Sequence, residues 1–87
     1  MNEKNYVSGS DKVNWQQRIE NCEVYILEKG KTKSLEVMAE VLHVIEHGKA
    51  IVIKELKEIN DWVERIENVT GKKINGLMFI VLTEDVV

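Results

Sequence analysis

Short apolar runs alternate with polar segments along this chain, and their lengths and composition predict strands. Residues 23–27 are rich in β-formers and too short for a helix, and residues 50–53 form a continuous apolar run that suits a strand buried on both faces. Residues 77–82 form the most apolar run, which needs a partner strand. Residues 5–10 predict a very short strand that ends in a Ser-Gly-Ser turn.

Between these runs, apolar residues recur at helical spacing. Three segments carry such a stripe: 11–21, 35–47 and 55–69. The middle segment has the clearest ends, because Ser34 has the side chain of an N-cap and Gly48 is a typical residue after a helix C-terminus. It also carries two neighbouring apolar stripes, so we expect other elements to cover this helix on more than one side.

The alternation of strands and helices predicts an α/β fold with a parallel sheet and right-handed crossovers. We expect one small three-layer domain over residues 1–87, with a mainly parallel four-stranded sheet and a truncated flavodoxin-like topology. Residues 1–4 precede the first strand and are expected to be flexible. No Pro-rich linker and no internal repeat divides the chain.

Charge and size limit the partners. The chain has 12 basic and 15 acidic residues, interleaved, so it has no basic stripe for a nucleic acid and we expect none to bind. A domain of 87 residues buries only about 60% of its unfolded surface, so self-association would help its stability. Together with the broad apolar coverage of helix 35–47, this predicts a homodimer or a larger homo-oligomer.

The sequence also favours a cytoplasmic protein. Cys22 is the only cysteine, so no internal disulfide can form, and we expect it to be a small buried apolar residue. The first eleven residues are polar and unlike a signal peptide, and no apolar run approaches the ~18 residues of a transmembrane helix. We expect no membrane association.

Four residues that can carry chemistry share one polar line of helix 35–47: Glu36, Glu40, His43 and His47. Glu-x-x-His metal sites in helical bundles need a second helix with the same set, and the sequence shows none, so we predict no metal site. Glu40 lies in the middle turns of a helix within a βαβ unit, and such units bind ligands beyond the carboxyl ends of their strands. Its simplest interpretation is a surface acid, and the alternative is a catalytic group.

Much of residues 4–54 resembles the nucleoside deoxyribosyltransferase family. The run Tyr6-Val7-Ser8-Gly9 is similar to the family's first strand and loop, and residues 19–27 are similar to its segment of helix, polar pair and apolar strand. Residues 34–49 are similar to its catalytic helix, which carries a glutamate before a Gly-Lys and a buried strand. The chain departs from the family at Val41, where a small residue is usual, at the 31–34 loop, and in the single short helix after the first strand.

The resemblance implies a role for Glu40 as a nucleophile. In the family, this glutamate attacks the anomeric carbon of a deoxynucleoside to form a glycosyl-enzyme ester, which a second base or water displaces. No metal or organic cofactor takes part. The resemblance also implies that the substrate site includes these residues of the first loop and of the second strand with its loop: Tyr6, Ser8, Gly9, Ser10, Tyr25 and Ser34.

Two functions from different classes remain open. The first is a reduced deoxyribosyltransferase or N-glycosidase that binds or cleaves nucleosides or nucleotides through Glu40. The second is a non-catalytic α/β module that binds a nucleotide or a protein and acts by sequestration or assembly. Release of free base distinguishes the two. In the family, subunits complete one another's sites, which again predicts a homo-oligomer.

Overall fold

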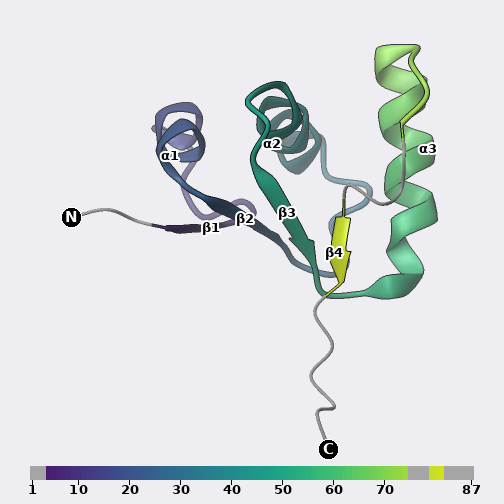
Figure 1. Ribbon diagram of the computed structural model, residues 1–87, viewed down its shortest axis with the longest axis horizontal. Coiled ribbons are helices and arrows are strands. Elements are labelled where there is room, and N and C mark those ends of the chain that lie inside the picture. The colour runs from purple at the N-terminus through teal and green to yellow at the C-terminus, as the bar shows by residue number, and fades with distance from the viewer. Residues whose placement is uncertain (1–3, 75–78, 82–87) are drawn as a thin grey trace, which may run out of the picture.

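A computed structural model describes residues 4–74 and 79–81, and it shows a small α/β fold (Figure 1). Strands alternate with helices in the order β1 (Asn5–Val7), α1 (Trp15–Asn21), β2 (Val24–Leu27), α2 (Leu35–Glu46), β3 (Ala50–Ile53), α3 (Ile59–Thr70) and β4 (Phe79–Val81). A short 3-10 helix, η1 (Leu56–Glu58), leads directly into α3. The predicted α/β class is confirmed.

The strands pair in parallel, in the same order as they follow one another in the chain. β1, β2 and β3 form the body of the sheet, and the short β4 pairs with the outer edge of β3. The register places Tyr6 beside Tyr25, Tyr25 beside Ile51, and Ile51 beside Phe79. All four side chains are buried, so one row across the sheet forms the floor of the core.

The described helices cover one face of the sheet only, which corrects the three-layer and flavodoxin-like prediction. Figure 1 shows α1, α2 and α3 on the same side of the strands. Each new strand is added beside the one before it, and right-handed crossovers that always advance in one direction place every helix on the same face. A flavodoxin-like sheet has a reversal of strand order, which places helices on both faces.

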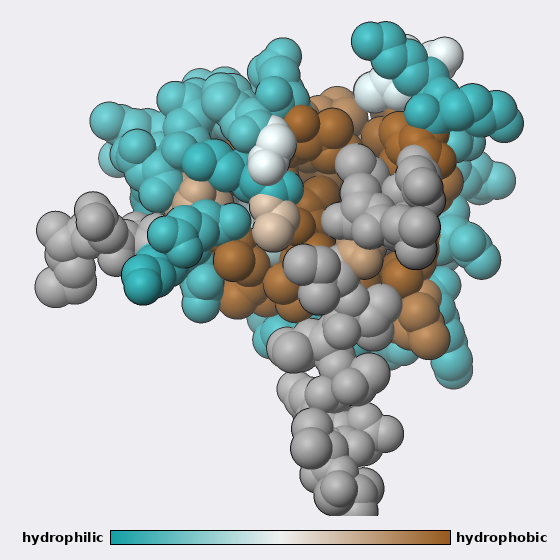
Figure 2. All heavy atoms as spheres, in the orientation of Figure 1, coloured by the Kyte–Doolittle hydropathy of each residue, from teal (hydrophilic) through white to brown (hydrophobic). Residues whose placement is uncertain are grey.

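The hydrophobic core lies between this helical layer and the sheet. Residues of β2 and β3 alternate between half-buried and buried, which corrects the prediction that 50–53 is buried on both faces. The half-buried positions form the other face of the sheet, and they are apolar: Val7, Val24, Ile26, Ala50 and Val52. Apolar side chains over β2 and β3 are visible in Figure 2.

Local hydrogen bonds explain where the predicted helix at 11–21 begins. The carboxylate of Asp11 accepts from the backbone N–H groups of Val13 and Asn14, both at 2.9 Å. This Asx turn keeps the chain out of the helix until Trp15, so the predicted start at residue 11 is wrong.

Several other local predictions have a clear outcome. The side chain of Ser34 accepts from the N–H of Val37 and caps α2, as predicted. Cys22 is buried, as predicted. The carbonyl of Lys4 accepts from the backbone N–H groups of Glu23 and Val24, which ties this residue to the start of β2. Of the predicted strand 77–82, residues 77, 78 and 82 lie outside the described residues, as do residues 1–3.

None of the described helices has the length and apolarity needed to cross a membrane.

Candidate active site

Glu40 is buried beneath α2 and faces the sheet, so its interpretation as a surface acid is wrong. Only 3% of the residue is exposed, and it is the single charged residue among the buried ones that the structure describes. A buried carboxylate is costly unless hydrogen-bond donors surround it. The position of those donors therefore defines the site.

Three donors from two different strands and a loop converge on this carboxylate. Oε1 accepts from the Tyr25 hydroxyl at 2.9 Å and from the Gly9 backbone N–H at 2.9 Å. Oε2 accepts from the Tyr6 hydroxyl at 3.1 Å. Such hydrogen bonds to an ionised acceptor are among the stronger ones in proteins. The carboxylate is thus fixed in one orientation.

The two tyrosines reach the same carboxylate because they are register partners. Tyr6 on β1 lies beside Tyr25 on β2, and their rings are stacked with centroids 5.9 Å apart. The guanidinium of Arg18 lies 5.2 Å above the Tyr6 ring. Both hydroxyls consequently point to the same end of the sheet, below the middle turns of α2.

The protonation of these phenols is well defined. Burial, and then the charge of Glu40, raises the pKa of both Tyr6 and Tyr25. The Tyr6 hydroxyl also accepts from the N–H of Asp11 at 3.2 Å, and it has a single proton to give. Since an ionised carboxylate is a better acceptor than the Asp11 carbonyl, we assign that proton to Glu40.

The loop after β1 supplies the third donor through a glycine. Gly9 has φ +73°, in the left-handed region where other residues are strained. The turn is closed by the N–H of Ser10, which donates to the carbonyl of Val7 at 3.1 Å. This conformation aims the N–H of Gly9 at the carboxylate of Glu40.

Glu40 also lines a cavity of about 360 Å³. The cavity lies at the carboxyl ends of β1 and β2, between the loops that lead into α1 and α2, where α/β folds bind ligands. Its volume is in the range of small-molecule sites, roughly 300–1,000 Å³. Gly9, Trp15, Lys31 and Ser34 contribute to its wall.

Charged side chains of both signs line the same cavity: Lys12 and Lys31, and Asp11 and Glu36. Asp11 is held ionised, because N–H donors from Asn14 and Val13 and the guanidinium of Arg18, 3.2 Å away, lower its pKa. An acid of this kind is a poor proton donor at neutral pH. The lysines are cations that an anionic ligand would meet.

The structure brings together most, but not all, of the predicted site residues. Gly9, Ser34 and Glu40 line the cavity, and Tyr6 and Tyr25 hold Glu40. The other two have different positions. Ser8 is buried, and its hydroxyl accepts from the backbone N–H of Glu28, just after β2. Its side chain therefore holds the end of β2, and Ser8 does not line the cavity. Ser10 is exposed and lies outside the cavity wall.

The loop from Lys29 to Ser34 was expected to border the site, and Lys31 and Ser34 line the cavity. Sequence reasoning missed other cavity residues, among them Asp11, Lys12 and Trp15. A signal for these three was present, because they follow the end of the first strand, and ligands bind beyond the carboxyl ends of parallel strands. Polar turn residues are common, however, and nothing in their spacing separates these from the others.

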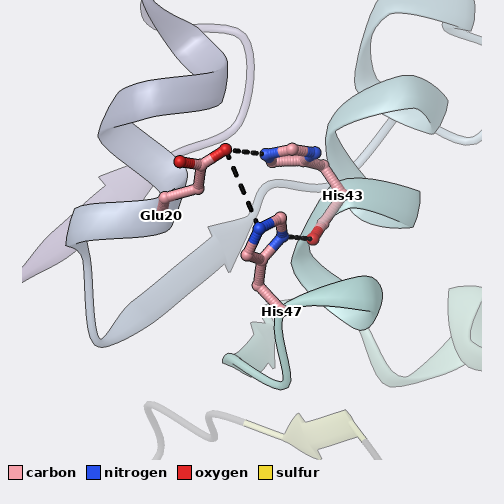
Figure 3. A group of neighbouring side chains, drawn as sticks. All are labelled: Glu20, His43 and His47. Carbon is pink, nitrogen blue, oxygen red and sulfur yellow. Dashed lines mark hydrogen bonds and ion pairs between the residues drawn. The ribbon is translucent and has the colours of Figure 1, made fainter.

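The predicted polar line of α2 is divided in the structure. Glu40 turns toward the sheet, whereas His43 and His47 turn toward α1 and meet Glu20 there (Figure 3). Sequence reasoning did not connect Glu20 with the histidines, which lie on a different helix.

Comparisons with known proteins add no assignment, since no protein-family model, curated protein or solved structure matches this chain.

Proposed function

We propose that this protein is an N-glycosidase or deoxyribosyltransferase that uses Glu40 as a nucleophile on nucleosides or nucleotides. The observation that carries the proposal is the buried Glu40, whose carboxylate accepts from three donors, at the wall of a ligand-sized cavity. A well-formed cavity with a few convergent polar groups is the usual place of a binding or active site. The resemblance of residues 4–54 to nucleoside deoxyribosyltransferases points to the same residue.

The arrangement supports covalent catalysis in two steps. A carboxylate oxygen of Glu40 attacks the anomeric carbon while the bond from that carbon to the base breaks, and the base leaves with the bonding pair and takes a proton from solvent. A water molecule then attacks the anomeric carbon and gives a proton to solvent, and the bond from that carbon to the Glu40 oxygen breaks to return the free carboxylate. Transfer to a second base would replace that water with the incoming base.

The neighbouring groups have distinct roles in this scheme. Tyr6, Tyr25 and the N–H of Gly9 orient the carboxylate before attack. Oε2 has one described donor and Oε1 has two, so Oε2 is the freer nucleophile. The ammonium groups of Lys12 and Lys31, which line the cavity, would attract the phosphate of a nucleotide.

We also propose that the protein is a homodimer or a larger homo-oligomer. The sheet face opposite the helices is apolar, and its residues Val24, Ile26 and Val52 are only half-buried in the described chain. A second copy offers the same face, and isologous contacts of this kind are the commonest interface in soluble proteins. Such a pairing would add burial that a chain of 87 residues lacks.

The alternative is a non-catalytic module that binds a nucleotide in the same cavity and acts by sequestration or assembly. The mixed charges of the cavity wall favour a polar ligand under either hypothesis. The two hypotheses differ in one product, the free base.

Incubation of the purified chain with deoxynucleosides and deoxynucleotide monophosphates, followed by chromatography of free bases, tests the proposal. We expect base release by the wild type and a loss of about a thousandfold or more in Glu40→Gln, because the amide cannot form the ester. Glu64→Gln, an exposed residue of α3, is the matched control and should keep the wild-type rate. Saturable binding with no base released would favour the sequestration hypothesis.

A further inference from the structure

A second group of chemically competent side chains lies outside the Glu40 cavity, where α1 packs beside α2. Glu20 is near the end of α1, and His43 is in the last turn of α2. His47 is the first residue after α2. Figure 3 shows the three side chains pointing toward one another across the gap between the two helices. They contribute no residue to the Glu40 cavity.

The ligand atoms of these residues converge. Glu20 Oε2 lies 2.8 Å from Nε2 of His43 and 3.8 Å from Nε2 of His47. Each residue offers one ligand atom, and these three atoms all lie within 4.8 Å of one another. In a tetrahedral zinc site with bonds of about 2.0–2.1 Å, ligand atoms are about 3.3 Å apart. Small side-chain rotations therefore bring the three atoms to bonding distance of one ion.

A hydrogen bond already orients one histidine as a metal site needs. Nδ1 of His47 lies 3.0 Å from the carbonyl oxygen of His43, and this oxygen can only accept. Nδ1–H is therefore the donor to this carbonyl, and Nε2 is the ring nitrogen that faces Glu20. Metal-binding histidines are commonly fixed in this way by a backbone carbonyl.

The hydrogen bond between Glu20 and His43 does not by itself explain the arrangement. His47 is the third member, and its Nε2 approaches the same oxygen that His43 already contacts. The imidazole rings of His43 and His47 lie with centroids 4.3 Å apart. Both rings thus offer nitrogen ligands to one point beside a single carboxylate.

We propose that Glu20, His43 and His47 form a binding site for a divalent transition metal, with Zn²⁺ as the ion that fits best. Two imidazoles and a carboxylate suit Zn²⁺, whereas Mg²⁺ and Ca²⁺ prefer oxygen ligands. Three protein ligands leave a fourth position for water or another ligand. Because the ligands are partly exposed, the ion can enter from solvent without unfolding of the chain.

The site would link α1 to α2 and so act on the Glu40 cavity from outside. Trp15 at the start of α1 lines that cavity, and its ring packs edge-on against His43 with centroids 5.5 Å apart. A bound ion would hold this wall in place. The proposal does not depend on catalysis by Glu40.

Zinc titration of the tag-free, chelator-treated chain by calorimetry tests the site. We expect saturable binding of one Zn²⁺ per chain and a higher unfolding temperature with the ion bound. His47→Ala and Glu20→Gln should each weaken the affinity about tenfold or more. Glu23→Gln, an exposed acid just before β2, is the control and should bind as the wild type does.

Two results would overturn the proposal: the absence of saturable zinc binding by the wild type, or equal affinity in Glu20→Gln and the wild type. Co²⁺ provides an independent measurement, since a tetrahedral nitrogen and oxygen site gives visible absorption bands. Those bands should be present in the wild type and reduced in both variants. Glu20→Gln keeps the test decisive if His47→Ala does not fold, because the Glu20 side chain is 45% exposed and its loss leaves the core intact.

Discussion

At the residue scale, the central feature is a carboxylate that the fold buries and then surrounds with donors. The Tyr6 and Tyr25 hydroxyls and the N–H of Gly9 all approach Glu40. An apolar residue at this position would need none of them, and buried charged groups are often no more stabilising than apolar replacements. The arrangement therefore supports the chemical role that we propose for Glu40.

Removal of one phenolic donor should destabilise the fold. Tyr25→Phe deletes a hydroxyl that lies 2.9 Å from Oε1 and leaves the buried carboxylate with fewer partners. We expect a loss of about 1–3 kcal/mol in the free energy of unfolding, measured by urea denaturation. The same change in a Glu40→Leu background should cost clearly less, because no charge then needs the donor. Equal costs in the two backgrounds would show that Tyr25 does not act through Glu40.

The same phenols predict how stability depends on pH. Burial and the Glu40 charge raise the pKa of Tyr6 and Tyr25, so the folded chain keeps these protons at a pH where unfolded tyrosines, with a pKa of about 10, lose them. Their contribution is complete below about pH 10 and is lost as pH rises above it. The fall in unfolding temperature from about pH 8 to about pH 11, an interval that crosses the ordinary tyrosine pKa of about 10, should be smaller in Tyr25→Phe than in the wild type. An identical fall in both proteins would contradict this assignment.

Individual residues were predictable to different degrees. Glu40 was found from its place in a helix of a βαβ unit and from the family resemblance, but its burial was not, because a helical wheel places it on the polar line with His43. The turn at Gly9 was predicted, whereas the position of Ser10 outside the cavity wall and the buried hydroxyl of Ser8 depend on the local path of the loop.

At the scale of elements, the loop between β1 and α1 connects backbone conformation to the site. Gly9→Ala places a side chain in left-handed backbone, which costs roughly 1–2 kcal/mol, and its new Cβ would lie 3.9 Å from Val37. Gly48→Ala is a matched control, because Gly48 has φ +67° and open space around it. We expect similar losses of stability in both variants, but a loss of base release only in Gly9→Ala, since only Gly9 donates to Glu40. Equal rates of base release in Gly9→Ala and Gly48→Ala would show that the N–H of Gly9 does not contribute to catalysis by Glu40.

Element positions followed well from the sequence where caps and turns define them. Ser34 begins α2 and Gly71, with φ +71°, ends α3. The start of α1 was missed because the Asp11 side chain competes for the backbone N–H groups that would form the first turn. The prediction of three layers, with helices on both faces of the sheet, was wrong for a different reason. Which face a helix covers depends on which strands are neighbours in the sheet, and the apolar periodicity within a strand carries no information on that order.

At the scale of the whole molecule, helices on one side leave an apolar sheet face on the other. If that face joins two copies, light scattering of the wild type should give at least twice the chain mass of 10.1 kDa. Ile26→Lys should return the mass to that of one chain, because a charge would then be buried in the contact. Val13→Lys is the control, since Val13 is 85% exposed and lies in the loop before α1. A wild type that scatters as a single chain would contradict the proposed assembly.

The account depends most on Glu40 as a nucleophile, and the intact mass of the protein during turnover tests that claim most directly. Rapid acid quenching after mixing with a deoxynucleoside that yields free base should trap the glycosyl-enzyme ester. We predict a species heavier by one deoxyribosyl group, located on the peptide that contains Glu40 and absent in Glu40→Gln. Base release without any such species, or a modified peptide that does not include Glu40, would contradict the account.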